Sequence, residues 1–471
     1  MKNTKDYISE KLKGSFDLKI REVDTTLGKA TVIFIDDMCS TVFVSQYIVA
    51  PLINAKVGIN SIEDMASRAL DINIVGYAKN DDDAILHILS GDVIVLFDNY
   101  DGKLLYCEAK GFIRRGVSIP VSEAVLKGPR EGFTEAFVDN VALIRRRIKD
   151  PDLKFEPIYV GDKSNTVVCL TYLKGTAPKG LVDYVRNQIN ELDYDFILDT
   201  NYIENKLRDK NTIFDTIGYT EKPDTVVAKL MEGRIAVLVD GTPFAMTAPC
   251  FFIETFQAQD DYYINRYYAN FTRFMRWLAF FFAAFLPGLY LAIVTYHFDV
   301  IPPSFVFRLA VSRAGVPIPT VVEVILMMVF FQLIKEAGLR LPQPIGTAMS
   351  IVSALILGDA AVGAGIASRI TILVVAISSL SYFLIPRIYG ALTVWSMILI
   401  IMAAFLGLPG FFVGVMLMFA HICNLKSCGY YYMFPIGTLK KLKLKDIVFR
   451  GPLEDISNDF LGEDDTNEKI K

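Results

Sequence analysis

Charged residues are distributed unevenly along the chain, and this feature constrains the fold more than any other. The 149 residues from Trp277 to Leu425 contain only ten Asp, Glu, Lys or Arg, which leaves 90 of the 100 charged residues for the other 322 positions. Long stretches with so few charges are typical of helices that cross a bilayer. The chain is therefore expected to combine a water-soluble part with a membrane part.

The part before the apolar stretch has the pattern of an α/β (α+β) protein. Short β-rich runs, such as 30–36 and 166–173, alternate with amphipathic helical runs, one of which begins after Pro178. One unit occurs twice: residues 84–98 and 226–240 each read as a helix, a glycine and an alternating strand that ends in Asp. This repeat favours two related subdomains, although any helix followed by a hairpin gives a similar pattern.

These patterns predict an order of domains along the chain. The α/β part is expected to consist of two cytoplasmic subdomains, and the apolar part is expected to form an α-helical polytopic membrane domain. The expected boundaries are a mobile or helical leader at 1–29, subdomains at 30–155 and 156–255, a linker at 256–273, a membrane domain at 274–425 and a basic-then-acidic tail at 426–471.

The number of membrane crossings follows from the apolar runs. The run from Trp277 to Tyr296 has 20 residues without a charge, enough to span about 30 Å as a helix. Further runs occupy 321–338, 345–366, 370–386 and 388–425, and the last is long enough for two spans broken at 407–410. We favour six crossings; four is the alternative, because 321–338 carries three charged residues.

Basic residues on both sides of the apolar region predict its orientation. Arginines precede the first run and lysines follow the last, so both flanks are expected on the cytoplasmic side, where basic residues accumulate. Arg308 and Arg313, which follow the first run, fit this orientation only if they lie on an interfacial helix.

The sequence offers no recognisable enzyme or nucleic-acid chemistry. The net charge is −4, and no Lys/Arg cluster with interleaved aromatics suggests nucleic acid as a partner. Phosphate-binding loops, nucleophile elbows and HExxH motifs are missing from the sequence. His421, Cys423 and Cys428 resemble a metal motif only weakly and are equally well explained as the end of a membrane helix. We therefore expect that the protein is not an enzyme and that it holds no cofactor and no metal site.

A basic cluster in the soluble part is the first candidate site. Residues 128–150 begin with a Gly-Pro turn and predict a helix with one apolar face, acidic residues early and Arg145, Arg146 and Arg147 late. The three arginines are candidates for docking a partner subunit or anionic lipid headgroups. The alternative is an ordinary surface helix.

A predicted helix at 345–367 carries the second candidate site. One face carries Leu355, Asp359, Val362 and Ile366, and the opposite face carries the small residues Ala354, Gly358, Ala361 and Gly365. Small residues at this spacing let helices pack closely, and a carboxylate is costly in lipid. We expect Asp359 either to pair with Arg369 or Arg387, or to line a hydrated pathway in which Val362 forms an apolar constriction.

Several long motifs resemble one known family. These are GPREGFTE (128–135), NVALIRRRIKDPDL (140–153), EGRIAVLVDGTPFAMTAP (232–249), RWLAFFFAAFLPGLYLA (276–292) and KEAGLRLPQPIG (335–346). In this order they are similar to the A subunits of bacterial spore germinant receptors, the GerA family. The resemblance extends from about residue 30 to about residue 435.

The resemblance implies a function that composition alone does not show. It implies a multi-pass protein of the spore inner membrane whose soluble N-terminal domain is cytoplasmic. It also implies a transporter-like B subunit and a lipoprotein C subunit as partners, and a homo-oligomer of A subunits that forms a germinant-gated cation channel. The alternative is a membrane-anchored scaffold subunit without a pore. A transporter would need inverted repeats, which the sequence does not suggest.

Overall fold

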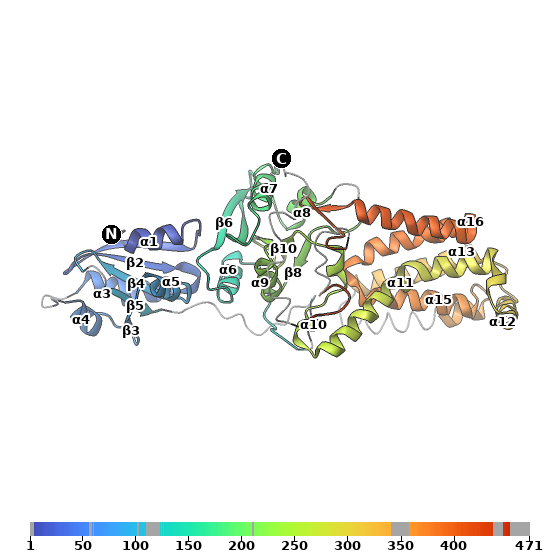
Figure 1. Ribbon diagram of the computed structural model, residues 1–471, viewed down its shortest axis with the longest axis horizontal. Coiled ribbons are helices and arrows are strands. Elements are labelled where there is room, and N and C mark those ends of the chain that lie inside the picture. The colour runs from blue at the N-terminus through green and yellow to red at the C-terminus, as the bar shows by residue number, and fades with distance from the viewer. Residues whose placement is uncertain are drawn as a thin grey trace.

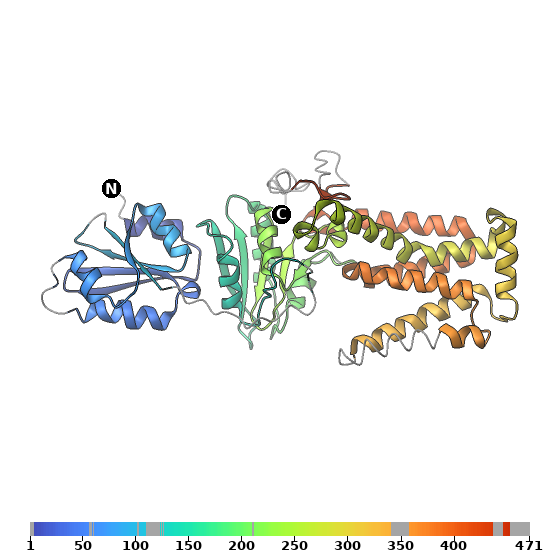
Figure 2. The same ribbon diagram turned by 90° about the horizontal axis from the view of Figure 1, so that it is seen from below.

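The protein consists of three bodies in a row: two sheet domains and a helical region (Figure 1). The computed structural model describes residues 4–55, 59, 61–100, 103–109, 123, 125, 127–209, 212–340, 358–436 and 446–452. The sheet of the first domain lies at one end of the long axis, the second sheet lies in the middle, and the helices extend to the other end (Figures 1 and 2).

The first domain is a five-stranded antiparallel sheet with the order β1-β2-β4-β5-β3. Its strands are β1 (Leu18–Thr25), β2 (Gly28–Ile35), β3 (Val75–Ala78), β4 (Asp92–Phe97) and β5 (Leu104–Glu108). Helices α1 (Thr4–Lys11) and α5 (Asp81–Leu89) cover one face; η1 (Asp36–Met38) follows β2; and α2 (Thr41–Phe43), η2 (Val44–Val49), α3 (Ala50–Ile53), α4 (Ile62–Asp64) and η3 (Met65–Ala69) cover the other face. All of β4 is buried because helices cover both faces.

The residues expected to form a leader are part of this domain. Strand β1 pairs with β2 along its whole length, from Leu18 opposite Ile35 to Thr25 opposite Gly28. The charged residues of β1 hide the alternation of apolar and polar residues that is typical of a strand, because four consecutive positions of this edge strand are exposed. The first domain therefore begins before residue 30.

The second domain repeats the strand order of the first. Its antiparallel sheet has the order β6-β7-β9-β10-β8. The strands are β6 (Leu153–Val160), β7 (Thr166–Leu173), β8 (Gly218–Thr220), β9 (Ile235–Val239) and β10 (Ala245–Ala248). Helices α7 (Lys179–Asn190) and α8 (Asn201–Leu207) cover one face, and α6 (Phe137–Arg145) and α9 (Pro223–Met231) cover the other.

The repeated helix-glycine-strand unit occupies equivalent places in the two sheets. Gly91 follows α5 and Gly233 follows α9, with φ of +90° and +84°, the left-handed conformation that ends a helix. The strands that follow, β4 and β9, are the central strands of their sheets. The repeat seen in the sequence thus reflects the same topology in both domains.

The helical region is built around α11 (Arg266–Tyr296), which packs against α15 (Arg369–Ser381) and α16 (Tyr389–Asn424). Two short elements precede α11, namely η4 (Phe252–Phe256) and α10 (Asp260–Tyr263). The other elements after α11 are η5 (Phe298–Val300), α12 (Pro303–Arg313), α13 (Thr320–Arg340), η6 (Tyr382–Leu384), η7 (Pro386–Ile388), β11 (Lys426–Ser427) and β12 (Tyr430–Tyr431). Within the described ranges, two helical stretches are long and apolar enough to cross a membrane, Arg266–Tyr296 and Pro386–Asn424.

Helix α16 folds back on itself at Gly407, as the glycine-proline motif predicted. Gly407 has φ +62° and ψ −141°, values that no helix contains. The rings of Trp395 and His421 lie 5.7 Å apart, whereas 26 residues of straight helix would separate them by about 39 Å. The last apolar run is therefore a pair of antiparallel helices.

Candidate functional site

The segment around Asp359 lies on the surface of the helical region. Residues 358–363 are helical, Asp359 is exposed and Val362 is half-buried. Ala361 is 2% exposed and packs in the same cluster as Val324 and Met327 of α13. Two of the predicted members of these faces, Ala354 and Leu355, lie outside the described residues.

The helix ends at residue 363, earlier than the expected end at Ala367. Gly365 has φ +67°, and its N–H donates to the Val362 carbonyl at 3.0 Å, while the Ile366 N–H donates to the Ala361 carbonyl at 2.8 Å. This pair of bonds is a Schellman motif with Gly365 just after the helix. Gly365 and Ile366 therefore lie in a turn. Gly365 ends the helix, and the arrangement of residues on a helical wheel does not show this.

Neither proposed arginine is shown as an ion-pair partner of Asp359. The Arg387 guanidinium instead lies 3.0 Å from the carboxylate of Glu123, which also accepts the hydroxyl of Thr220 at 2.6 Å. Arg369 is exposed at the start of α15. The structure thus leaves the Asp359 carboxylate on an outer surface of this single chain.

Arg145 is a buried structural residue and not part of a docking surface. Its side chain is 0% exposed, and its Nη2 lies 2.9 Å from Oδ2 of Asp17, which is also fully buried. The guanidinium stacks over Phe155 of β6, 4.9 Å from the ring centroid. Since Asp17 belongs to the first domain and Phe155 to the second, Arg145 joins the two sheets.

Arg146 and Arg147 remain near the surface, but both are engaged by one carboxylate. The Glu131 oxygens lie 3.5 Å from Arg146 Nη1 and 2.6 Å from Arg147 Nη2. Arg147 also donates to the carbonyl of Leu143. Helix α6 packs into the core of the second sheet, so the sequence 128–150 belongs to the second domain.

A cluster of buried charges lies where the second domain meets α11; we call it the junction. At its centre, the fully buried Asp261 accepts bonds from Arg273 Nε at 2.8 Å and from both terminal nitrogens of Arg276 at 2.8 Å. Burial would raise the pKa of the Asp261 carboxyl, but the bonds from Arg276 and Arg273 outweigh it and lower the pKa. The first turns of α11 are thereby tied to α10.

Part of the expected basic-then-acidic tail contributes to the junction. Asp446 accepts the hydroxyl of Tyr262 at 2.6 Å and Arg273 Nη1 at 2.7 Å. Arg450 is 6% exposed, and its guanidinium donates to the carbonyls of Asp261 and Ile264. Residues 446–452 therefore pack along the base of α11.

A second buried ion pair extends the junction into the sheet. Glu254 of η4 is paired with Arg234 and, at 3.0 Å, with Lys229. Burial alone would raise the pKa of Glu254, but Arg234 and Lys229 hold it at about 2. The carboxylate is therefore ionised at neutral pH and fixes η4 to the start of β9.

The chain leaving α16 is also fixed to the second domain. Ser427 Oγ accepts the N–H of Cys250 at 2.9 Å and donates to the carbonyl of Thr216. Tyr430 and Phe434 are buried in the core of the second sheet. Both the first and the last apolar helices are therefore anchored on the same domain.

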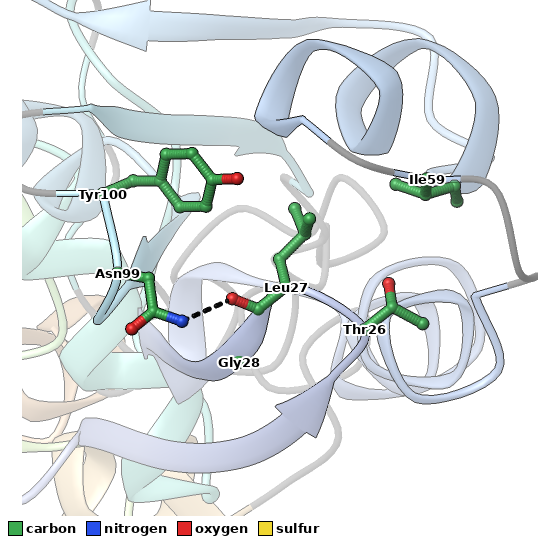
Figure 3. A pocket seen from close by; sticks show the side chains of 6 residues that line it. All are labelled: Thr26, Leu27, Gly28, Ile59, Asn99 and Tyr100. Atoms are coloured by element: carbon green, nitrogen blue, oxygen red, sulfur yellow. Dashed lines mark hydrogen bonds between the residues drawn. The ribbon is translucent and has the colours of Figure 1, made fainter.

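The remaining candidate features lie in different parts of the structure. A hollow of about 540 Å³ in the first domain is lined by uncharged residues, and Asn99 there donates to the Leu27 carbonyl at 2.9 Å (Figure 3). His421 lies 3.1 Å from the hydroxyl of Thr212, whereas Cys428 is buried in the sheet core. Among the described residues, no three His, Cys, Asp or Glu side chains gather as metal ligands would.

Sequence patterns did not reveal the junction, because its partners are far apart in the chain. Asp446 and Arg273 are 173 positions apart, and Arg450 and Asp261 are 189 positions apart. The available signal was the high density of Asp, Arg and Tyr at 260–276, which is unusual for a flexible linker.

Comparison with known proteins gives one consistent family. The model of the GerA family, Bacillus/Clostridium GerA spore germination protein, matches residues 6–459. Spore germination protein KA of Bacillus subtilis (strain 168) is 34% identical over 93% of this chain and 80% of its own length. GerLA of Bacillus cereus, a spore germination protein, is 32% identical over 91% of this chain and 89% of its own.

One further relative matches nearly the whole chain, and one solved structure matches part of it. The membrane protein YfkQ of Bacillus subtilis (strain 168), whose role is not characterised, is 33% identical over 93% of this chain and 86% of its own. The solved structure is the N-terminal domain of the A subunit of the Bacillus megaterium spore germinant receptor GerK3. The similarity covers 52% of this chain and 93% of that one, with 29% sequence identity and a TM-score of 0.39.

Proposed function

Because the chain belongs to the GerA family of spore germination proteins, we propose that it is the A subunit of a nutrient germinant receptor and forms part of an oligomeric, germinant-gated cation channel. It would assemble with a B subunit and a C subunit. It would lie in the spore inner membrane, with both sheet domains on the cytoplasmic side. The helical region would cross the membrane, and α12 would lie at its outer surface.

The exposure of Asp359 is the observation that carries the channel proposal. The carboxylate lies on the surface of a region that is otherwise almost free of charge. A carboxylate that faces lipid at the bilayer centre costs about 2.5–3.5 kcal/mol, and less towards the membrane surface. A water-filled space shared by several copies removes this cost, because the carboxylate then stays hydrated and attracts cations.

The position of Val362 supports the same proposal. It is half-buried in the last turn of the same helix, one turn from Asp359. In a ring of copies it would place an apolar constriction next to a ring of carboxylates. The carboxylates would attract cations, and the apolar constriction would block their passage while the ring is narrow.

The scaffold function remains as a second candidate because the junction favours it. Both ends of the apolar region are fixed to the second domain, as a passive membrane anchor would require. The two functions differ in one consequence: ion flux depends on Asp359 only if the chain lines a pathway.

The proposed orientation predicts which positions a membrane-impermeant thiol reagent reaches from outside. Five of the six cysteines are buried, so Cys423→Ser gives a background without an exposed thiol. Added to it, Ser304→Cys on α12 should be labelled, whereas Tyr267→Cys at the base of α11 should be protected in intact cells. Labelling of Tyr267→Cys together with protection of Ser304→Cys would mean the opposite orientation.

Asp359→Asn tests the channel directly in spores. We expect normal assembly and a severalfold slower release of potassium after addition of nutrient, because the amide preserves the shape but removes the charge that concentrates cations. Asp299→Asn is the matched control, since this exposed aspartate lies in η5, just before α12. Release at the parental rate from Asp359→Asn spores that contain normal amounts of the protein would favour the scaffold.

A further inference from the structure

A fully buried carboxylate connects four helices at the end of the helical region far from the sheets. Glu323 lies in the first turn of α13 and is 0% exposed. Its Oε1 accepts the backbone N–H of Ser368, the residue that caps the N-terminus of α15. Its Oε2 is buried and has no hydrogen-bond partner among the residues that the structure describes, and Arg313 at the end of α12 lies 4.0 Å away.

A short series of hydroxyl groups extends this contact to α11. Ser368 Oγ donates to Thr371 Oγ1 at 3.0 Å, and the Tyr290 hydroxyl lies 3.0 Å from the same oxygen. Ser368 is 1% exposed and Thr371 is 0% exposed, so solvent does not replace these bonds. Glu323 thus fixes the start of α15 relative to α11, α12 and α13.

The same contact fixes the turn that follows Asp359 and Val362. The turn at 364–368 runs from the Schellman motif to Ser368, whose N–H is held by Glu323. A Cβ on Gly365 would lie 2.9 Å from the carbonyl oxygen of Gly315, so this turn also touches the loop after α12. Only four residues separate Gly363, the last helical residue, from Ser368. This short turn is a path by which a shift of Ser368 can reach Val362.

We propose that Glu323 is a positioning residue that holds this turn, and with it the Val362 constriction, in the closed arrangement. The inference rests on the proposed channel and adds the element that keeps it closed. The Glu323–Ser368 bond acts as a latch between α13 and the turn, and opening requires that it breaks. The nearby Arg313 connects the latch to α12, whose exposed side chains include Phe305, Phe307 and Val311.

The latch is tested by breaking one hydrogen bond from both sides. Glu323→Ala removes the acceptor. Ser368→Pro removes the donor N–H at a φ of −74° that suits proline, and it also removes the side-chain hydroxyl, which Ser368→Ala removes alone. Each variant should release potassium without nutrient about tenfold faster than the parent, since a buried bond to a charged group shifts an equilibrium by about that much. The double variant should be no faster than the faster single variant, because both remove the same bond.

Matched controls separate the latch from a general loss of packing. Glu336→Gln changes an exposed carboxylate on the same helix that pairs with Arg340, and it should behave like the parent. Ser368→Ala removes the hydroxyl but keeps the N–H, so it should leak less than Ser368→Pro. Glu323→Gln, which keeps an acceptor but loses the charge, should be intermediate, and it decides the question if Glu323→Ala fails to accumulate.

The outcomes distinguish failure of the latch from failure of the channel. The latch proposal is overturned if Glu323→Gln and Ser368→Pro accumulate normally and release potassium no faster than the parent while Val362→Ala leaks. The channel proposal would then still hold. Equal leakage from Glu336→Gln would also overturn it. If Val362→Ala does not leak either, the channel proposal itself fails.

Discussion

Spores whose receptor carries Val362→Ala are expected to release potassium in the absence of nutrient. Val362 is half-buried in the last helical turn before Gly365, next to the exposed Asp359. A ring of valines from several copies would keep a narrow passage dry, and alanine would widen it enough for water and ions to enter. Because a dewetted gate responds steeply to its diameter, we expect the leak to exceed the parental background by about an order of magnitude.

The control for this variant is Val374→Ala on α15, which makes the same change at another half-buried position of the helical region. Potassium in the medium is measured over time before nutrient is added. If Val362→Ala accumulates normally and leaks no more than Val374→Ala, the pathway does not pass this residue.

Replacement of Asp261 by alanine is expected to weaken the junction severely. The change leaves Arg273 buried beside one remaining carboxylate, and it removes both bonds from Arg276 to Asp261, so that only the bond to the Phe256 carbonyl still orients Arg276. Removal of one partner from a buried ion pair costs about 3–5 kcal/mol. We therefore expect Asp261→Ala to lower the melting temperature of the solubilised protein and to expose the chain near 257–265 to proteases.

The pH dependence of this effect follows from the pKa of Asp261. The folded-state pKa is lowered below the usual 3.8, so the stabilisation is fully present above that value and is lost as the pH falls through the folded-state pKa. The difference between the parent and Asp261→Ala should thus be constant near neutral pH. Asp195→Ala, which removes an exposed ion pair with Lys163, should change stability by less than about 1 kcal/mol. A similarly small effect of Asp261→Ala would contradict the junction.

Local patterns predicted those elements whose signals lie within a few residues. Strand β7 has the expected bounds of 166–173, the helix after Pro178 buries its predicted face, and Gly407 breaks the last apolar run. In each case a period of two or 3.6, or one glycine, is sufficient.

Elements that depend on distant partners were predicted poorly. Strand β1 is recognisable only through its pairing with β2, because its own residues are mostly charged and exposed. Arg145 reads as a surface residue until Asp17 is brought to it, and residues 446–452 read as a tail until Arg273 and Asp261 are seen beside them. Glu323 counted against a membrane span, although its burial is what connects the helices.

The most direct test of the account is whether the chain itself conducts cations. Full-length protein with Val362→Ala is reconstituted into potassium-loaded liposomes, and release is compared with that from empty liposomes and from liposomes that contain the Val362→Ala, Asp359→Asn double variant. The account predicts release above the empty liposomes, slowed in the double variant because the lumen has lost its charge. Release no faster than from empty liposomes, with the protein inserted and assembled, would contradict the account and identify the helical region as an anchor.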